Sequence, residues 1–169
     1  RAILYRLDAS AYSTTKTAAE LASGRAAFDQ WQGVPGTVLR FEEGPLLQGV
    51  TDVRSGDFTN TLFWTRKLFV NGNRDNLSGI QALTYVAAFS EGNVIADTDT
   101  VFNGVQFRWF TDFFDPTTQG TFVEAIALHE IGHFLGLRHS PVGGATMLAV
   151  GDFGVNSQVG LASDERTAA

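Results

Sequence analysis

The 169-residue sequence has no cysteine, one methionine and only three histidines. The absence of cysteine excludes disulfides, cysteine-bound zinc and a cysteine nucleophile. No apolar run reaches the roughly 18 residues that a membrane-spanning helix needs. The N-terminal residues show neither the basic nor the apolar region of a signal peptide. We therefore expect no membrane partner.

Basic residues are also few and dispersed. The sequence holds 12 Lys and Arg against 18 Asp and Glu, which gives a formal net charge of -6. A nucleic-acid partner would need a concentrated positive surface, so none is expected. A hydrophobic content of 44% with 18% charged residues is typical of a globular chain. The length predicts a single domain over residues 1–169.

The residue patterns predict short strands first and a second helix late. Strands are expected at Ile3–Leu7, Val38–Glu42, Thr61–Thr65, Ala82–Ser90 and Val94–Phe102, and helices at Thr17–Gln32 and Phe122–Leu135. The last two strands should form a hairpin. This order predicts an α+β fold.

Two details of these elements follow from local spacing. Thr17 with Glu20, and Thr121 with Glu124, have the spacing of a capping box at the start of each helix. Residues 66–79 are rich in polar residues and are expected to form a loop.

All three histidines lie in one segment, HEIGHFLGLRH, at residues 129–139. His129 and His133 are four residues apart, so on a helix they project from one face. That placement lets two imidazole nitrogens converge on a zinc ion at roughly 2.0–2.1 Å. Glu130 follows the first histidine, where it can reach a metal-bound water without binding the metal itself.

A catalytic zinc site needs a third protein ligand and an open position. His139 can be that ligand only if the chain reverses after the helix. Gly136 suits this reversal, because glycine tolerates the left-handed conformation at a helix C-terminus. A bare HExxH spacing also arises by chance, but unrelated histidines have no reason to fall at these intervals. The sequence predicts one catalytic Zn²⁺ bound by all three.

The HExxHxxGxxH motif, followed by a methionine, resembles the signature of the metzincin clan. Ser140, directly after the third histidine, makes the chain similar to the matrixins, the matrix-metalloproteinase-like family. Residues 145–147 (ATM) resemble the Met-turn, so Met147 would lie beneath the zinc as a structural base. The match is specific over residues 121–147. It implies a twisted, mostly parallel sheet with an antiparallel edge strand, an active-site helix and a short or truncated C-terminal helix.

The resemblance implies a secreted, monomeric zinc endopeptidase that hydrolyses extended protein or peptide substrates. Glu130 would activate a zinc-bound water as general base and then act as general acid. Substrate would pair with residues 82–90 by β-augmentation; a strand edge without a ligand is the equal alternative. The apolar segment 148–153 would line the pocket for the residue after the scissile bond. Asp164 would pair with the α-amino group of Arg1.

Four features of animal matrixins are missing or altered. No histidine is left for a second zinc, no glycine-rich calcium loop is recognisable, no cysteine-switch propeptide is present, and the last helix would be short. Asp97 and Asp99 share one face of a strand and could bind Ca²⁺, which takes six to eight oxygens. A solvated strand face is the favoured interpretation, so calcium is possible but unsupported. Together these features favour a microbial matrixin-like protease.

Two alternatives stay open. The first is a zinc-containing binding or adhesion module with no turnover, although a metal site of that kind would not need Glu130. The second is another metzincin branch with a different range of substrates.

Overall fold

The computed structural model describes residues 2–92, 94–114, 120–149 and 160–168. In chain order the elements are β1 (Ile3–Leu7), α1 (Thr17–Gln32), β2 (Phe41–Glu43), β3 (Thr61–Thr65), β4 (Phe69–Val70), β5 (Asp75–Asn76), β6 (Ala82–Ala88), β7 (Ile95–Asn103), β8 (Trp109–Phe110), β9 (Thr121–Phe122), α2 (Val123–Phe134) and α3 (Ser163–Ala168). The predicted α+β class is confirmed. No helix in these ranges is long and apolar enough to cross a membrane.

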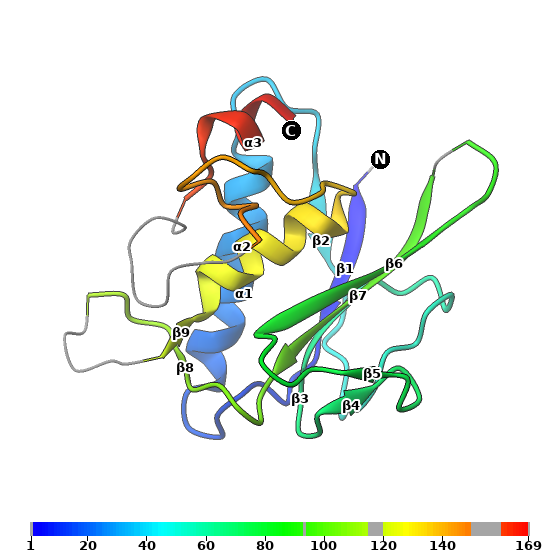
Figure 1. Cartoon of the computed structure of the whole chain (residues 1–169), viewed down its shortest axis with the longest axis vertical. Coiled ribbons are helices and arrows are strands. Elements are labelled where there is room, and N and C mark those ends of the chain that lie inside the picture. Colours follow the sequence, from blue (N-terminus) through cyan, green and yellow to red (C-terminus); the bar gives the residue numbers. More distant parts are fainter. Residues whose placement is uncertain (1, 93, 115–119, 150–159, 169) are drawn as a thin grey trace.

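The central element is a five-stranded sheet with the order β2-β1-β3-β7-β6 (Figure 1). The first four strands in this order run parallel, whereas β6 pairs antiparallel with β7. The predicted antiparallel edge strand and the predicted hairpin are therefore both confirmed. One long edge of β6 has no neighbouring strand in the sheet.

Helices α1 and α2 pack together on one side of this sheet (Figure 1). The core between them is apolar, and Phe28 and Trp31 of α1 are almost completely buried in it. Trp31 Nε1 also donates a hydrogen bond to the carbonyl of Leu128 on α2 at 3.0 Å. Because this donor is satisfied inside the core, the contact fixes α2 relative to α1. The helix that carries His129 and His133 thus has a rigid base.

A second, smaller core lies around Phe63 and Val101. The β4–β5 hairpin contributes to it, so the prediction of a polar loop over residues 66–79 is wrong. Val70 and Leu77 in this segment are fully buried, which explains why it is ordered. The carboxylate of Asp52 accepts hydrogen bonds from the backbone of the hairpin turn, at Asn71 and Gly72.

Strand β2 begins at Phe41, three residues later than predicted. The register with β1 covers only Phe41–Glu43. Val38 is 89% exposed and contributes nothing to the core. Gly36, with φ of +87°, turns the chain before this point, and Leu39 N then donates to the hydroxyl of Thr37 at 3.1 Å rather than to a neighbouring strand.

Neither predicted capping box forms. Glu20 accepts a hydrogen bond from the backbone N–H of Ser13, upstream of the helix, rather than from Thr17. Thr121 lies in β9, where its hydroxyl accepts a hydrogen bond from a glutamine on the segment before β6. Glu124 accepts one from the side chain of a glutamine on α1. In each case a more distant partner replaces the local one.

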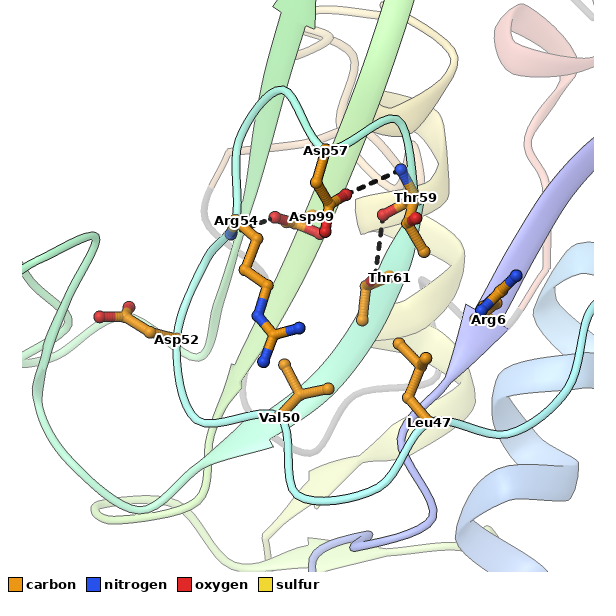
Figure 2. Close-up of a pocket in the computed structure, with 9 residues that line it drawn as sticks. All are labelled: Arg6, Leu47, Val50, Asp52, Arg54, Asp57, Thr59, Thr61 and Asp99. Atoms are coloured by element: carbon orange, nitrogen blue, oxygen red, sulfur yellow. Dashed lines mark hydrogen bonds between the residues drawn. The ribbon is translucent and has the colours of Figure 1, made fainter.

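Asp97 and Asp99 are 1% and 2% exposed, so the predicted solvated strand face is wrong. The loop between β2 and β3 folds over them and turns its backbone N–H groups toward the carboxylates. Asp99 accepts a hydrogen bond from Arg54 N at 2.7 Å, and Asp97 accepts one from Gly56 N at 2.5 Å. Figure 2 shows Asp99 and Asp57 at a pocket of about 170 Å³ beside this loop. The carboxylates of Asp97 and Asp99 on β7 hold the loop against this strand.

Asp99 should make the stability of the fold depend on pH. Burial raises the pKa of Asp99 from 3.8 to about 6. The folded chain therefore holds this proton more tightly than the unfolded chain. The contribution of Asp99 to the free energy of unfolding is therefore most favourable below pH 3.8. It is lost as the pH rises from 3.8 through about 6.

Asp99→Asn removes the ionisation and keeps an oxygen that can accept the hydrogen bond from Arg54 N. We expect the variant to gain stability over the wild type at pH 8, by at most about 3 kcal/mol, and to gain less at pH 4.5. Urea unfolding of both proteins at the two pH values measures this difference. A gain that does not change with pH would contradict the assignment to Asp99.

Candidate metal centre

The segment HEIGH lies on α2, and the chain reverses after this helix where the sequence predicts it. Gly136 has φ of +88°, in the left-handed region. Its N–H donates to the carbonyl of His133 at 2.8 Å, and Leu137 N donates to that of Gly132 at 2.9 Å. These two bonds form a Schellman motif. The reversal brings His139 back to the helix, where its Nε2 lies 3.1 Å from Nε2 of His133.

The structure brings the three histidines together. One ring nitrogen from each of His129, His133 and His139 lies within 4.8 Å of the others. Two nitrogens bound tetrahedrally to one zinc ion at 2.0–2.1 Å would be roughly 3.3 Å apart, close to the 3.1 Å between His133 and His139. Over the described ranges, no other set of three histidine or carboxylate side chains is gathered closely enough to hold a metal.

The other ring nitrogens fix the orientation of two imidazoles. His129 Nδ1 lies 2.6 Å from the carbonyl oxygen of Thr146, and His133 Nδ1 lies 2.8 Å from that of Leu137. A carbonyl oxygen can only accept, so each Nδ1 carries a proton and each Nε2 keeps its lone pair for a metal. Burial lowers the pKa of His129 to about 4 and also lowers the pKa of His133. Both rings are therefore neutral at neutral pH, which is the form that binds metal ions.

Glu130 lies between α2 and the edge strand and is 5% exposed. Its Oε2 accepts a hydrogen bond from the hydroxyl of Thr84 on β6 at 2.7 Å. Burial raises the pKa of Glu130 to about 7, against the smaller opposing effect of the Thr84 bond. A carboxylate with a pKa in this range suits proton transfer in both directions near neutral pH. Thr84 is not recognisable from the sequence as a site residue, because only the tertiary fold brings it to the helix.

Met147 is 2% exposed and packs against α2 between the two histidines of the helix. Gly132 makes this approach possible, since a Cβ added there would overlap Sδ of Met147 and lie 3.3 Å from Cζ2 of Trp31. The residue before the methionine supplies the carbonyl that orients His129. The segment predicted to be a Met-turn thus lies directly under the histidine cluster.

Glu165 of α3 holds this segment in place. Its carboxylate is 3% exposed and accepts hydrogen bonds from Met147 N at 2.9 Å and from Ala162 N at 2.8 Å. Ser140 N donates to the carbonyl of Met147 at 2.8 Å, which connects the segment to the residue after the third histidine. The role of Glu165 is not recognisable from the sequence, because its partner Met147 lies 18 positions away in the chain.

Some expectations lie outside the described residues. The proposed contact between Asp164 and Arg1 is one of these, since neither Arg1 nor the Asp164 side chain is described. The expectation that residues 148–153 line a substrate pocket is another, since residues 150–153 are not described. For Ca²⁺, the described part of the chain provides no supporting group of carboxylates.

The sequence was also compared with known proteins. The family model described as Matrixin matches residues 1–169. Among curated proteins, none matches the chain. The family match extends well beyond the residues that carry the histidine motif and covers the whole sequence.

Proposed function

Because the chain belongs to the matrixin family of metallopeptidases, we propose that it is a zinc-dependent endopeptidase acting on extended protein substrates. The observation that carries the proposal is the cluster of His129, His133 and His139 beside the buried carboxylate of Glu130. A binding module would need the histidines but not the carboxylate. We propose that residues 1–169 act as one catalytic domain.

The three histidines would hold a single catalytic Zn²⁺. Two of them are neutral imidazoles whose Nε2 has a lone pair for the metal. His139 completes a three-ligand set that leaves one position open. When bound, zinc supplies Lewis-acid chemistry, polarising a carbonyl and lowering the pKa of a water to about 7. The donor set therefore fits the ion that the family implies.

Glu130 would carry out the proton transfers. Its carboxylate takes a proton from the attacking water, whose oxygen bonds to the carbonyl carbon of the scissile peptide. When the C–N bond breaks, Glu130 gives that proton to the leaving nitrogen. A pKa of about 7 supports both steps, since the carboxylate gains and releases a proton with little cost near neutral pH.

Strand β6 would bind the substrate. It lies at the edge of the sheet and can add an extended peptide through backbone hydrogen bonds along Ala82–Ala88. We further propose a monomeric, extracellular enzyme with no nucleic-acid or membrane partner. The net charge of -6 and the scattered basic residues support the absence of a polyanionic partner.

Cleavage of fluorescent casein, with and without a metal chelator, tests this proposal. We expect hydrolysis by the zinc-loaded chain, loss of hydrolysis with chelator and recovery when zinc is added back. A chain that binds zinc and cleaves neither casein nor gelatin would instead support the binding or adhesion module.

A further inference from the structure

We propose that Thr84 is a positioning residue that fixes the carboxylate of Glu130 and links it to the strand that binds substrate. This inference rests on the proposed function, because it concerns the residue that acts as the base. It is carried by three features of Thr84, namely its side-chain contacts, the direction of its backbone and its place on the edge strand.

The hydroxyl of Thr84 joins the sheet to α2. Thr84 Oγ1 lies 2.7 Å from Glu130 Oε2 and 2.8 Å from the hydroxyl oxygen of Thr100 on β7. An ionised carboxylate only accepts, so Thr84 donates its single proton to Glu130 and accepts one from Thr100. Across the described residues, Thr84 is the one hydrogen-bond partner of this carboxylate. The contact fixes Oε2, and Oε1, which no described residue contacts by a hydrogen bond, can exchange a proton.

The backbone of Thr84 faces the open edge of the sheet. Asn103 N donates to the carbonyl of Gln81 at 2.8 Å, so these two residues form a hydrogen-bonded pair. Such pairs alternate along an antiparallel ladder, and Thr84 opposite Thr100 is therefore a pair without backbone hydrogen bonds. Side chains approach closely in pairs of this kind, as the two hydroxyls do. The N–H and C=O of Thr84 point away from β7, toward a substrate strand.

Thr84 thus contacts the two components that must be aligned for hydrolysis. Its backbone groups are available to the substrate peptide, while its side chain holds the base. The histidines are oriented by other groups, the carbonyls of Thr146 and Leu137. We therefore expect the hydroxyl to affect the turnover step rather than zinc binding or substrate affinity.

Thr84→Val and Thr84→Ser in the full zinc-loaded chain test this role with an internally quenched peptide. Valine keeps the branched shape and the backbone but lacks the hydroxyl. We expect Thr84→Val to lower kcat by about 10- to 100-fold, the effect of losing a hydrogen bond to a charged group, with KM within about 3-fold and one zinc retained. Thr84→Ser restores the hydroxyl and should keep kcat within about 3-fold of the wild type.

Two further variants control for general effects on the sheet and on the hydrogen-bond chain. Leu4→Ala alters an exposed side chain on β1, away from the strand proposed to bind substrate, and should leave kcat unchanged. Thr100→Val removes the donor to Thr84; its effect on kcat should be smaller than that of Thr84→Val and should disappear in the double variant. Crystal structures of the zinc-bound forms provide a second readout, in which only Thr84→Val displaces the Glu130 carboxylate.

Unchanged kcat in Thr84→Val, an equal loss in Thr84→Ser, or a loss confined to KM would overturn the inference and leave the proposed function intact. A zinc-loaded wild type without any turnover would overturn the proposed function, and this inference with it.

Discussion

Glu130→Gln is expected to retain one zinc ion per chain while its hydrolytic rate falls by about 100- to 10,000-fold. Glutamine has nearly the same shape, and its amide oxygen can still accept the hydrogen bond from Thr84. It cannot take a proton from water, so the general-base step is lost. The three histidines do not depend on the Glu130 charge for their orientation, since two of them bond to backbone carbonyls.

Zinc content and peptide hydrolysis measured on the same preparation check this result. Glu124→Gln is the matched control, because Glu124 lies on the same helix and bonds to a glutamine of α1 away from the histidines. We expect it to keep both zinc and activity. Glu130→Gln protein that still cleaves the substrate would exclude Glu130 as the base.

Gly132→Ala is expected to lower the free energy of unfolding of the zinc-free protein by about 1–3 kcal/mol and to weaken zinc binding. The new methyl group would overlap Sδ of Met147 and crowd Trp31, which is completely buried. Met147 is itself buried and its N–H is held by Glu165, so the side chain has little room to move aside. Its displacement would disturb the segment that supplies the carbonyl to His129.

Gly24→Ala on α1 is the matched control for this prediction. It makes the same change inside a helix, but the nearest atoms to the added Cβ are side-chain carbons of Leu7 at 3.9 and 4.0 Å. Alanine is a better helix former than glycine, so this variant should be neutral or gain up to about 1 kcal/mol. Urea unfolding compares the two, and equal stability of the two variants would contradict the packing of Met147 against Gly132.

The local sequence was sufficient to predict the elements that depend on short spacing. The boundaries of β1, α1 and β3 agree with the structure residue for residue. The histidine cluster was also predictable, because the four-residue helical spacing and the glycine at position 136 determine how the ligands converge. These features depend on neighbours within about ten positions.

Features that depend on distant partners were missed. Asp97 and Asp99 follow a pattern that a solvated strand face would also show, but a loop 41 to 45 positions away supplies backbone N–H groups to the two buried carboxylates. In the sequence nothing distinguishes Thr84 from other strand residues, and only the tertiary fold shows that it lies next to Glu130. The capping boxes failed for the same reason, since their side chains found tertiary partners instead.

Zinc content per chain, determined for the wild type and for His139→Ala, tests the metal site most directly. His139 is exposed and lies after the end of the helix, so its removal should cost a ligand without disturbing the core. We predict one zinc ion per wild-type chain and loss of that ion in His139→Ala. Two zinc ions per wild-type chain, or a zinc ion retained at full occupancy in His139→Ala, would contradict a single site built from three histidines.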